Sequence, residues 1–146
     1  MIYYEAKDFP VDALLAIGED VQVHVPAGTA YRTYKLVGGQ DGSITVVGDG
    51  DGNVRRSGDG TGHARHYGNG TGHAYRDGDG DGDAYRYGNG TGHAYRYGDG
   101  DGGASRWGAG DGSAVRSGKG KGDAYRSGTG SGDARRDGGG EIEEDE

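Results

Sequence analysis

The chain contains no cysteine, two prolines, one methionine and one phenylalanine among its 146 residues. The lack of cysteine excludes disulfide bonds and thiolate metal sites, and it is compatible with any cellular compartment. Hydrophobic residues make up only 30% of the sequence, which is too little for an ordinary globular core. A composition of this kind predicts a disordered chain, unless a regular repeat gives it a fold.

Long hydrophobic runs are also missing. The most apolar segment, Ala13–Ile17, is far too short to cross a bilayer, so we expect no membrane partner. The first ten residues, "MIYYEAKDFP", lack the basic region and the apolar stretch of a secretory signal. We therefore expect a protein without a signal peptide that is assembled in the cytoplasm.

An excess of positive charge is absent as well. The net charge is -8, to which residues 1–40 contribute -2, residues 41–140 contribute -1 and residues 141–146 contribute -5. The central hundred residues are nearly neutral, with Arg and Asp interspersed, so they offer no basic groove for a nucleic acid. We interpret residues 141–146 as an acidic tail that aids solubility and blocks strand addition at the end of the fold.

Glycine, in contrast, is abundant, at 36 positions. From residue 41 to residue 140, blocks of ten follow the consensus x-G-x-A-x-R-x-G-x-G without an insertion, as in "DGDAYRYGNGTGHAYRY". A flexible linker would not keep Ala and Arg in register, and collagen requires Gly at every third residue. Alternation of Gly with other residues is instead the period of a β-strand.

We therefore predict an all-β fold, a thin β-solenoid with one ten-residue repeat per coil. Ten residues at about 3.3 Å each give a perimeter of about 33 Å, whose interior has room for little beyond hydrogen and methyl groups. Glycine and alanine at the even places fit that interior, while the bulky odd places face outward. Arg at the sixth place does not fit this interior. Either the chain turns there and expels it, which we expect, or that face of the coil is open to solvent.

Residues 1–40 differ in kind, and we expect them to form an N-terminal cap or docking segment before the solenoid of residues 41–140. The stretch "VQVHVPAGTAYRTYKLV" alternates, breaks at Pro26 and alternates again, which predicts a β-hairpin. The hairpin would cover the open end of the solenoid, or it would attach the protein to a second copy or to another protein.

One run of carboxylates partly matches a metal-binding loop. Asp77, Asp79 and Asp81 match the start of a calcium-binding EF-hand loop. The twelfth loop position is Gly88 rather than Glu, and the Gly-rich sequence supplies no flanking helices, so we predict no cofactor, with calcium as the alternative. The sequence also contains no nucleophile elbow and no acid–base pair in a defined context, so we predict that the protein is not an enzyme.

The fifth, sixth and seventh places form the edge with the most binding chemistry. Stacked coils would align Tyr over Tyr and Arg over Arg along the rod. Such columns stabilise a solenoid, or they bind a glycan, a surface receptor or another protein through aromatic planes and guanidinium groups. The candidate residues are Tyr67, Tyr75, Tyr85, Arg86, Tyr87, Tyr95, Arg96, Tyr97, Arg106, Trp107 and Tyr125.

The stretch "GDGDGDAYRYGNGTGHAYRYGDG" resembles the glycine-rich decapeptide-repeat proteins encoded by tailed bacteriophages. The resemblance covers about residues 48–140. It implies a phage origin and a non-enzymatic role in the virion, as a decoration protein, fibre or adhesin-like component. The residues leave a second hypothesis open, in which the Tyr/Arg edge grips a host factor inside the infected cell as an inhibitor.

Overall fold

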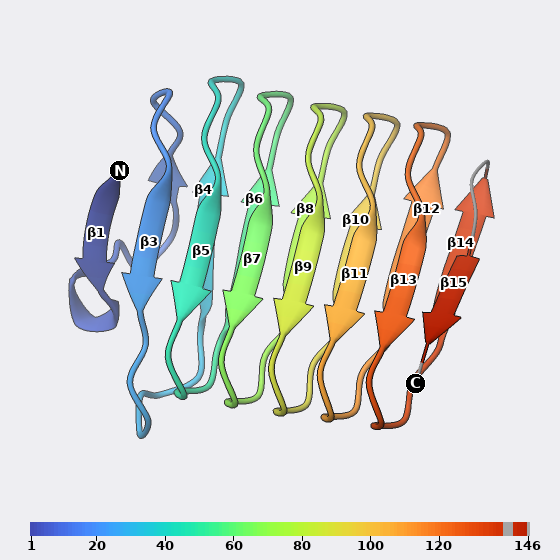
Figure 1. Ribbon diagram of the computed structural model, residues 1–146. Helices are drawn as coiled ribbons and strands as arrows, with labels where there is room; N and C mark the ends of the chain where they lie inside the picture. Colours follow the sequence, from blue (N-terminus) through green and yellow to red (C-terminus); the bar gives the residue numbers. More distant parts are fainter. Residues whose placement is uncertain (139–141, 146) are drawn as a thin grey trace.

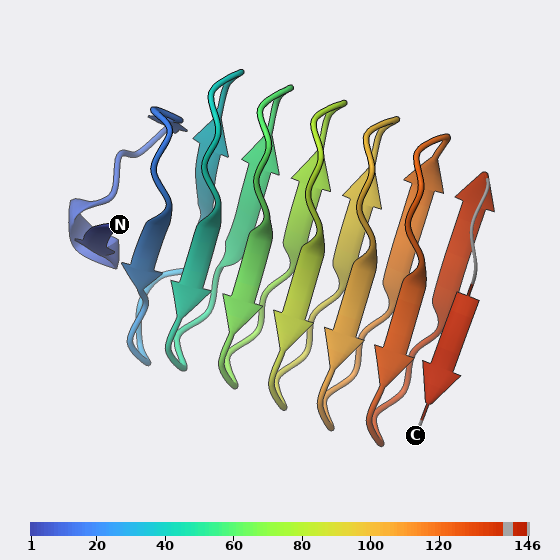
Figure 2. The ribbon, with the colours of Figure 1, turned by 45° about the horizontal axis from the view of Figure 1, so that its top comes forward.

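Two parallel β-sheets face each other along a rod, as Figure 1 and Figure 2 show from two directions. The computed structural model describes residues 1–138 and 142–145. Sheet A consists of β1 (Ile2–Glu5), β3 (Val21–His24), β5 (Ile44–Val47), β7 (Ala64–Tyr67), β9 (Ala84–Tyr87), β11 (Ala104–Trp107), β13 (Ala124–Ser127) and β15 (Ile142–Asp145). Sheet B consists of β2 (Leu14–Leu15), β4 (Thr33–Val37), β6 (Asn53–Ser57), β8 (Ala74–Asp77), β10 (Ala94–Tyr97), β12 (Ala114–Gly118) and β14 (Ala134–Gly138). A short 3-10 helix, η1 (Ala6–Asp8), follows β1.

The predicted β-solenoid is confirmed, but its coil is twice as long as we predicted. Ala94 of β10 lies between Ala74 of β8 and Ala114 of β12, so paired residues are 20 positions apart. Each coil therefore uses two decapeptides, one in each sheet, and the chain makes about seven turns. A single decapeptide supplies one strand and one reversal of direction, whereas a closed coil needs two of each.

The Arg residues of the sixth place lie inside the solenoid, which corrects the prediction that the chain expels them. Strand alternation is kept, because Ala at the fourth place and Arg at the sixth both point inward. The longer coil provides the space that a ten-residue coil would lack. The buried arginines are Arg56, Arg76, Arg86, Arg96, Arg106 and Arg116 at 0% exposure, Arg126 at 3% and Arg136 at 8%.

Each buried guanidinium lies against a glycine turn of the preceding coil. In Arg86, Nε donates to the carbonyl of Gly72 at 2.8 Å, Nη1 to that of Gly68 at 3.0 Å and Nη2 to that of Gly70 at 2.5 Å. Nη1 also donates to the carbonyl of Tyr87. The same offsets recur along the ladder. Burial lowers the pKa of Arg86 to about 10, so the group stays charged at neutral pH and is stabilised by carbonyl dipoles.

The glycines of the repeat are required by these close approaches. A Cβ atom on Gly92 would lie 1.7 Å from the carbonyl oxygen of Gly72 and 2.8 Å from Nε of Arg86. Gly88 adopts a φ of 129°, which side chains other than hydrogen rarely allow. Stacked turns and buried guanidinium groups therefore explain glycine at the second, eighth and tenth places.

Residues 1–40 form the first coils of the solenoid, so the predicted β-hairpin is wrong. β3 pairs with β1 and β5 in sheet A, while β4 pairs with β2 and β6 in sheet B, and all of these pairs are parallel. Local alternation around Pro26 suggested a hairpin, but pairing with distant strands buries the apolar side chains of both segments. The core at this end is apolar and includes Phe9, Val21, Val23, Val25, Tyr34, Leu36, Ile44, Val46 and Val54.

The opposite end of sheet A is formed by part of the predicted acidic tail. β15 pairs in parallel with β13, with Ile142 beside Ala124. These backbone pairs extend the sheet, so residues 142–145 belong to the solenoid. Glu141 and Glu146 of the predicted tail lie outside the described residues.

We expect Gly92→Ala to lower the free energy of unfolding by about 3 kcal/mol or more, because the methyl group overlaps a backbone carbonyl and a buried guanidinium. Chemical unfolding followed by circular dichroism measures the change. Gly39→Ala is the control, because no heavy atom lies within 4 Å of its Cβ position. Equal effects of the two substitutions would contradict the packing described.

Replacing one buried arginine tests the ladder itself. We expect Arg96→Met to cost about 3–5 kcal/mol of stability, because the carbonyls of Gly78, Gly80 and Gly82 lose their donors. Arg96→Lys should recover little, since one ammonium group cannot reach three carbonyls. The exposed Arg135→Met is the matched control in the neighbouring region of sheet B, and its unfolding midpoint should stay near that of the unmodified protein.

Candidate binding faces

The outward residues of each strand stack in columns along the rod. Residues 20 positions apart are neighbours in a column, and the third, fifth and seventh places of each decapeptide supply the columns. Face A is the outer surface of sheet A, and face B is the outer surface of sheet B. The predicted aromatic residues on face A are Tyr67, Tyr85, Tyr87, Trp107 and Tyr125, and those on face B are Tyr75, Tyr95 and Tyr97.

The aromatic rings of face A form a continuous series of ring contacts. The rings of Tyr67 and Tyr87 are parallel, with centroids 4.8 Å apart. Trp107 follows at 5.0 Å from Tyr87 and turns its ring toward Tyr125, which it meets edge-on at 5.5 Å. Such contacts add to coil stacking, since each aromatic pair contributes about 0.5–1.5 kcal/mol beyond its buried area.

Face B carries two parallel stacks side by side. The rings of Tyr75 and Tyr95 are 5.1 Å apart, and the imidazoles of His73 and His93 are 4.9 Å apart. Tyr97 stacks against Tyr95 on the same strand, with ring centroids 5.7 Å apart. His93, directly before β10, and Tyr95 and Tyr97 on β10 therefore present an aromatic wall.

The predicted single Tyr/Arg edge is corrected in two respects. Arg86, Arg96 and Arg106 are fully buried and donate to backbone carbonyls, so they cannot contact a ligand. The aromatic residues divide between two faces, because consecutive decapeptides belong to different sheets. Tyr97 and Trp107 are the most accessible of them, at 39% and 46% exposure. The columns stabilise the coils and present aromatic surface at the same time.

The three predicted calcium ligands bond to groups of the protein. Asp81 Oδ1 accepts the backbone N–H of Asp101 at 2.9 Å, and Asp79 accepts an N–H of the next coil in the same way at 3.3 Å. The carboxylate of Asp77 pairs with Arg55. Among the described residues, no group of three or more acidic or histidine side chains is arranged to hold a metal ion. The carboxylates of the turns thus join neighbouring coils.

Histidines at the third place make the same kind of link. Nδ1 of His63 accepts the N–H of Asp83 at 2.8 Å, and Nδ1 of His73 accepts that of His93 at 2.9 Å. Nδ1 of His93 accepts the N–H of Ser113 at 2.7 Å. An acceptor nitrogen must be unprotonated, and burial lowers the pKa of all three histidines.

His66 precedes the first buried arginine in its column of sheet A. Its side chain is 0% exposed, and neither ring nitrogen has a hydrogen-bond partner among the described residues. Burial, with a contribution from the charge of Arg86, lowers the pKa of His66 to about 3. The residue stands where the apolar core, ending at Val46 in this column, gives way to the arginine ladder.

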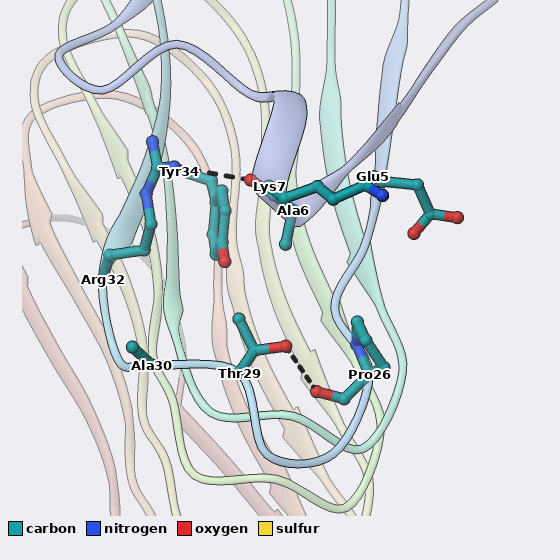
Figure 3. Close-up of a pocket in the computed structure, with 8 residues that line it drawn as sticks. All are labelled: Glu5, Ala6, Lys7, Pro26, Thr29, Ala30, Arg32 and Tyr34. Carbon is teal, nitrogen blue, oxygen red and sulfur yellow. Dashed lines mark hydrogen bonds between the residues drawn. The ribbon is translucent and has the colours of Figure 1, made fainter.

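A cavity of about 450 Å³ lies at the N-terminal end, between η1 and the loop before β4 (Figure 3). Arg32 lies with its guanidinium carbon 4.6 Å from the centre of the Tyr34 ring and donates to the carbonyl of Ala6. Thr29 closes the loop by donating to the carbonyl of Pro26 at 2.6 Å. The sequence predicted no site here, because the cavity depends on how the first coils wind rather than on a motif.

Comparison of the chain with protein-family models, with curated proteins and with solved structures found no match. Within the described residues, no helix has the length and apolar character needed to cross a membrane. The interpretation of the two faces therefore depends on their own geometry.

The buried histidine predicts acid sensitivity. An unfolded histidine binds a proton near its ordinary pKa of 6.5, while folded His66 stays neutral down to about pH 3. The unfolded chain thus gains protons first, and this contribution removes stability as the pH falls from 6.5 toward 3, at up to about 1.4 kcal/mol per pH unit. Denaturant unfolding at a series of pH values measures this change. The free energy of unfolding should fall less steeply with decreasing pH in His66→Leu than in the unmodified protein.

The partly buried histidines of the outer surface supply the comparison variant. His73→Asn keeps a side-chain acceptor of the type that Asn53 provides one coil earlier, where Asn53 Oδ1 accepts the N–H of His73 at 2.9 Å. We expect this substitution to change the pH slope less than His66→Leu does. An unchanged slope in His66→Leu would show that His66 is not held neutral by burial.

Proposed function

We propose that the chain is a non-enzymatic structural or adhesin-like component of a bacteriophage particle, as a decoration, fibre or tail-associated protein. The observation that carries the proposal is the ladder of buried arginines. Through it, successive coils repeat the same outer side chains at the spacing of about 4.8 Å between strands. A rod built in this way lengthens by adding coils and needs no larger core, which suits a structural element.

The two aromatic faces support a role in recognition. Trp107 on face A and Tyr97 on face B are large aromatic side chains that remain partly exposed on strands held rigidly by their neighbours. Tyr and Trp contribute strongly to binding interfaces because they bury much area at a small cost in side-chain entropy. A rigid rod with such columns fits an adhesin that contacts a surface receptor.

The N-terminal end supports attachment to another protein. Most large hydrophobic side chains that are exposed belong to the first coils, namely Met1, Tyr3, Val11, Leu15, Ile17 and Tyr31. An apolar cavity of about 240 Å³ lies beside Leu15 and Ile17. Clusters of exposed apolar residues mark contact sites, so residues 1–40 are the proposed docking segment, for a neighbouring particle protein or a second copy.

A second candidate function is supported by the same aromatic columns. A phage-encoded inhibitor inside the host would use Trp107 or Tyr97 as an anchor in a pocket of a host protein. The two functions differ in location, because a particle component remains with purified virions and an intracellular inhibitor does not.

Mass spectrometry of purified particles of the encoding phage tests the proposal. We expect the chain to be present in particles, and we expect Leu15→Asp with Ile17→Asp to leave it in the host lysate, because the charges disrupt the apolar end. Ala109→Asp, in an exposed turn far from that end, is the control and should still be incorporated. Absence of the unmodified chain from particles would contradict the proposal and favour the intracellular role.

A further inference from the structure

Face B contains a notch where its aromatic columns stop. Along the fifth place of sheet B, Tyr75 and Tyr95 are followed by Val115 and then by Arg135. Along the third place, the histidine stack is followed by Ser113. Small side chains on β12 therefore leave a hollow of about 220 Å³ between the aromatic wall of β10 and the polar residues of β14.

The dimensions of the notch suit one ring. β10 and β14 are separated by two strand spacings, which is about 10 Å. The ring of Tyr95 is nearly parallel to that of Tyr75, at an interplanar angle of 10°, so its other face is turned toward the notch. A ring above Val115 would continue the stack at the spacing of about 5 Å that aromatic pairs adopt. The volume is below the range of about 300–1,000 Å³ typical of sites for drug-sized ligands.

Face A has a similar change from an aromatic to a small residue at the fifth place, but the small residue there has a different neighbour. Its fifth place reads Tyr85, Ser105 and Tyr125 on successive strands. There Trp107 leans across and meets Tyr125 edge-on at 5.5 Å. On face B the seventh place of β12 is Ser117, which is too short to lean in the same way. The notch is thus a specific consequence of Val115 and Ser117.

The far wall of the notch is polar and charged. Arg135 of β14 and Asp133, directly before that strand, are both exposed and line it, and Ser113 lines its floor. A pyranose ring presents an apolar C–H face to an aromatic plane and hydroxyl groups around its edge. A carboxylate accepts hydrogen bonds from such hydroxyls, and a guanidinium donates two in parallel. We propose that the notch binds one uncharged saccharide ring, stacked on Tyr95 and hydrogen-bonded to Asp133 and Arg135.

Charge distinguishes a sugar from a nucleotide. A nucleobase would also stack on Tyr95, but a phosphate that paired with Arg135 would also approach the carboxylate of Asp133 on the same wall. An uncharged sugar meets no such repulsion. The assignment rests on the proposed function as an adhesin, for which a surface glycan is the receptor, although the notch itself is tested separately.

Methyl glycosides of glucose, galactose, mannose and N-acetylglucosamine are the probes. Saturation-transfer NMR detects binding, and amide shifts of the folded full chain locate it. We expect at least one glycoside to bind with a Kd of about 1 mM, the range for a single ring, and to shift the amides of Ser113, Val115 and Arg135. No binding by any glycoside, or shifts confined to other parts of the rod, would overturn the assignment. Tighter binding of adenosine monophosphate or indole than of every glycoside would overturn it too.

Variants separate the notch from the rest of the fold. Val115→Tyr continues the stack and fills the hollow, so binding should weaken at least about tenfold while the coil stays folded. Arg135→Gln should weaken binding about fivefold. Ser127→Tyr extends the aromatic column of face A and should leave binding unchanged. Full binding by Val115→Tyr would overturn the proposal. We expect variants that lose sugar binding still to be incorporated into particles, so failure of this site and failure of the proposed function give different results.

Discussion

The rest of the structure depends on the hydrogen bonds between buried guanidinium groups and backbone carbonyls of glycine turns. Arg86 reaches three carbonyls of the preceding coil and one next to itself, and Arg96 and Arg116 do the same. A chain with little hydrophobic surface thereby obtains an ordered interior in which the buried guanidinium groups are hydrogen-bonded. The glycines are needed because the turns pack directly on one another and on the guanidinium groups. The buried arginines and the glycines of the repeat therefore depend on each other.

The arginine–glycine interior determines how side chains are arranged on the two outer faces. Because the interior repeats every 20 residues, outer side chains of neighbouring coils lie one strand spacing apart. The residue type at each outer place can differ from coil to coil. Tyrosine, histidine, aspartate and serine occupy equivalent places in successive coils, so the rod offers different local surfaces on one scaffold. The notch above Val115 is the clearest case, since it arises from substitution of small residues into aromatic columns without any change of the backbone register.

The sequence allowed the solenoid and the outward aromatic columns to be predicted, since strict alternation with invariant glycine has few other solutions. The coil length could not be obtained, because ten- and twenty-residue coils share one sequence period. Because we assumed a ten-residue coil, we predicted that the arginines lie outside the solenoid. For the same reason we predicted one Tyr/Arg edge, whereas the aromatic residues lie on two faces. The predicted hairpin at Pro26 is wrong for a related reason. Strand alternation indicates that Val23 and Leu36 are buried, but it does not indicate that they belong to opposite sheets.

Hydrogen exchange of arginine side chains tests the central interaction most directly. NMR signals of Nε–H groups report each guanidinium separately in the folded protein. Buried arginines such as Arg86 and Arg96 should exchange slowly, at rates close to those of strand amides, whereas the outward-facing Arg55, Arg65 and Arg135 should exchange at once. Fast exchange at all arginines would contradict a polar interior held together by guanidinium groups.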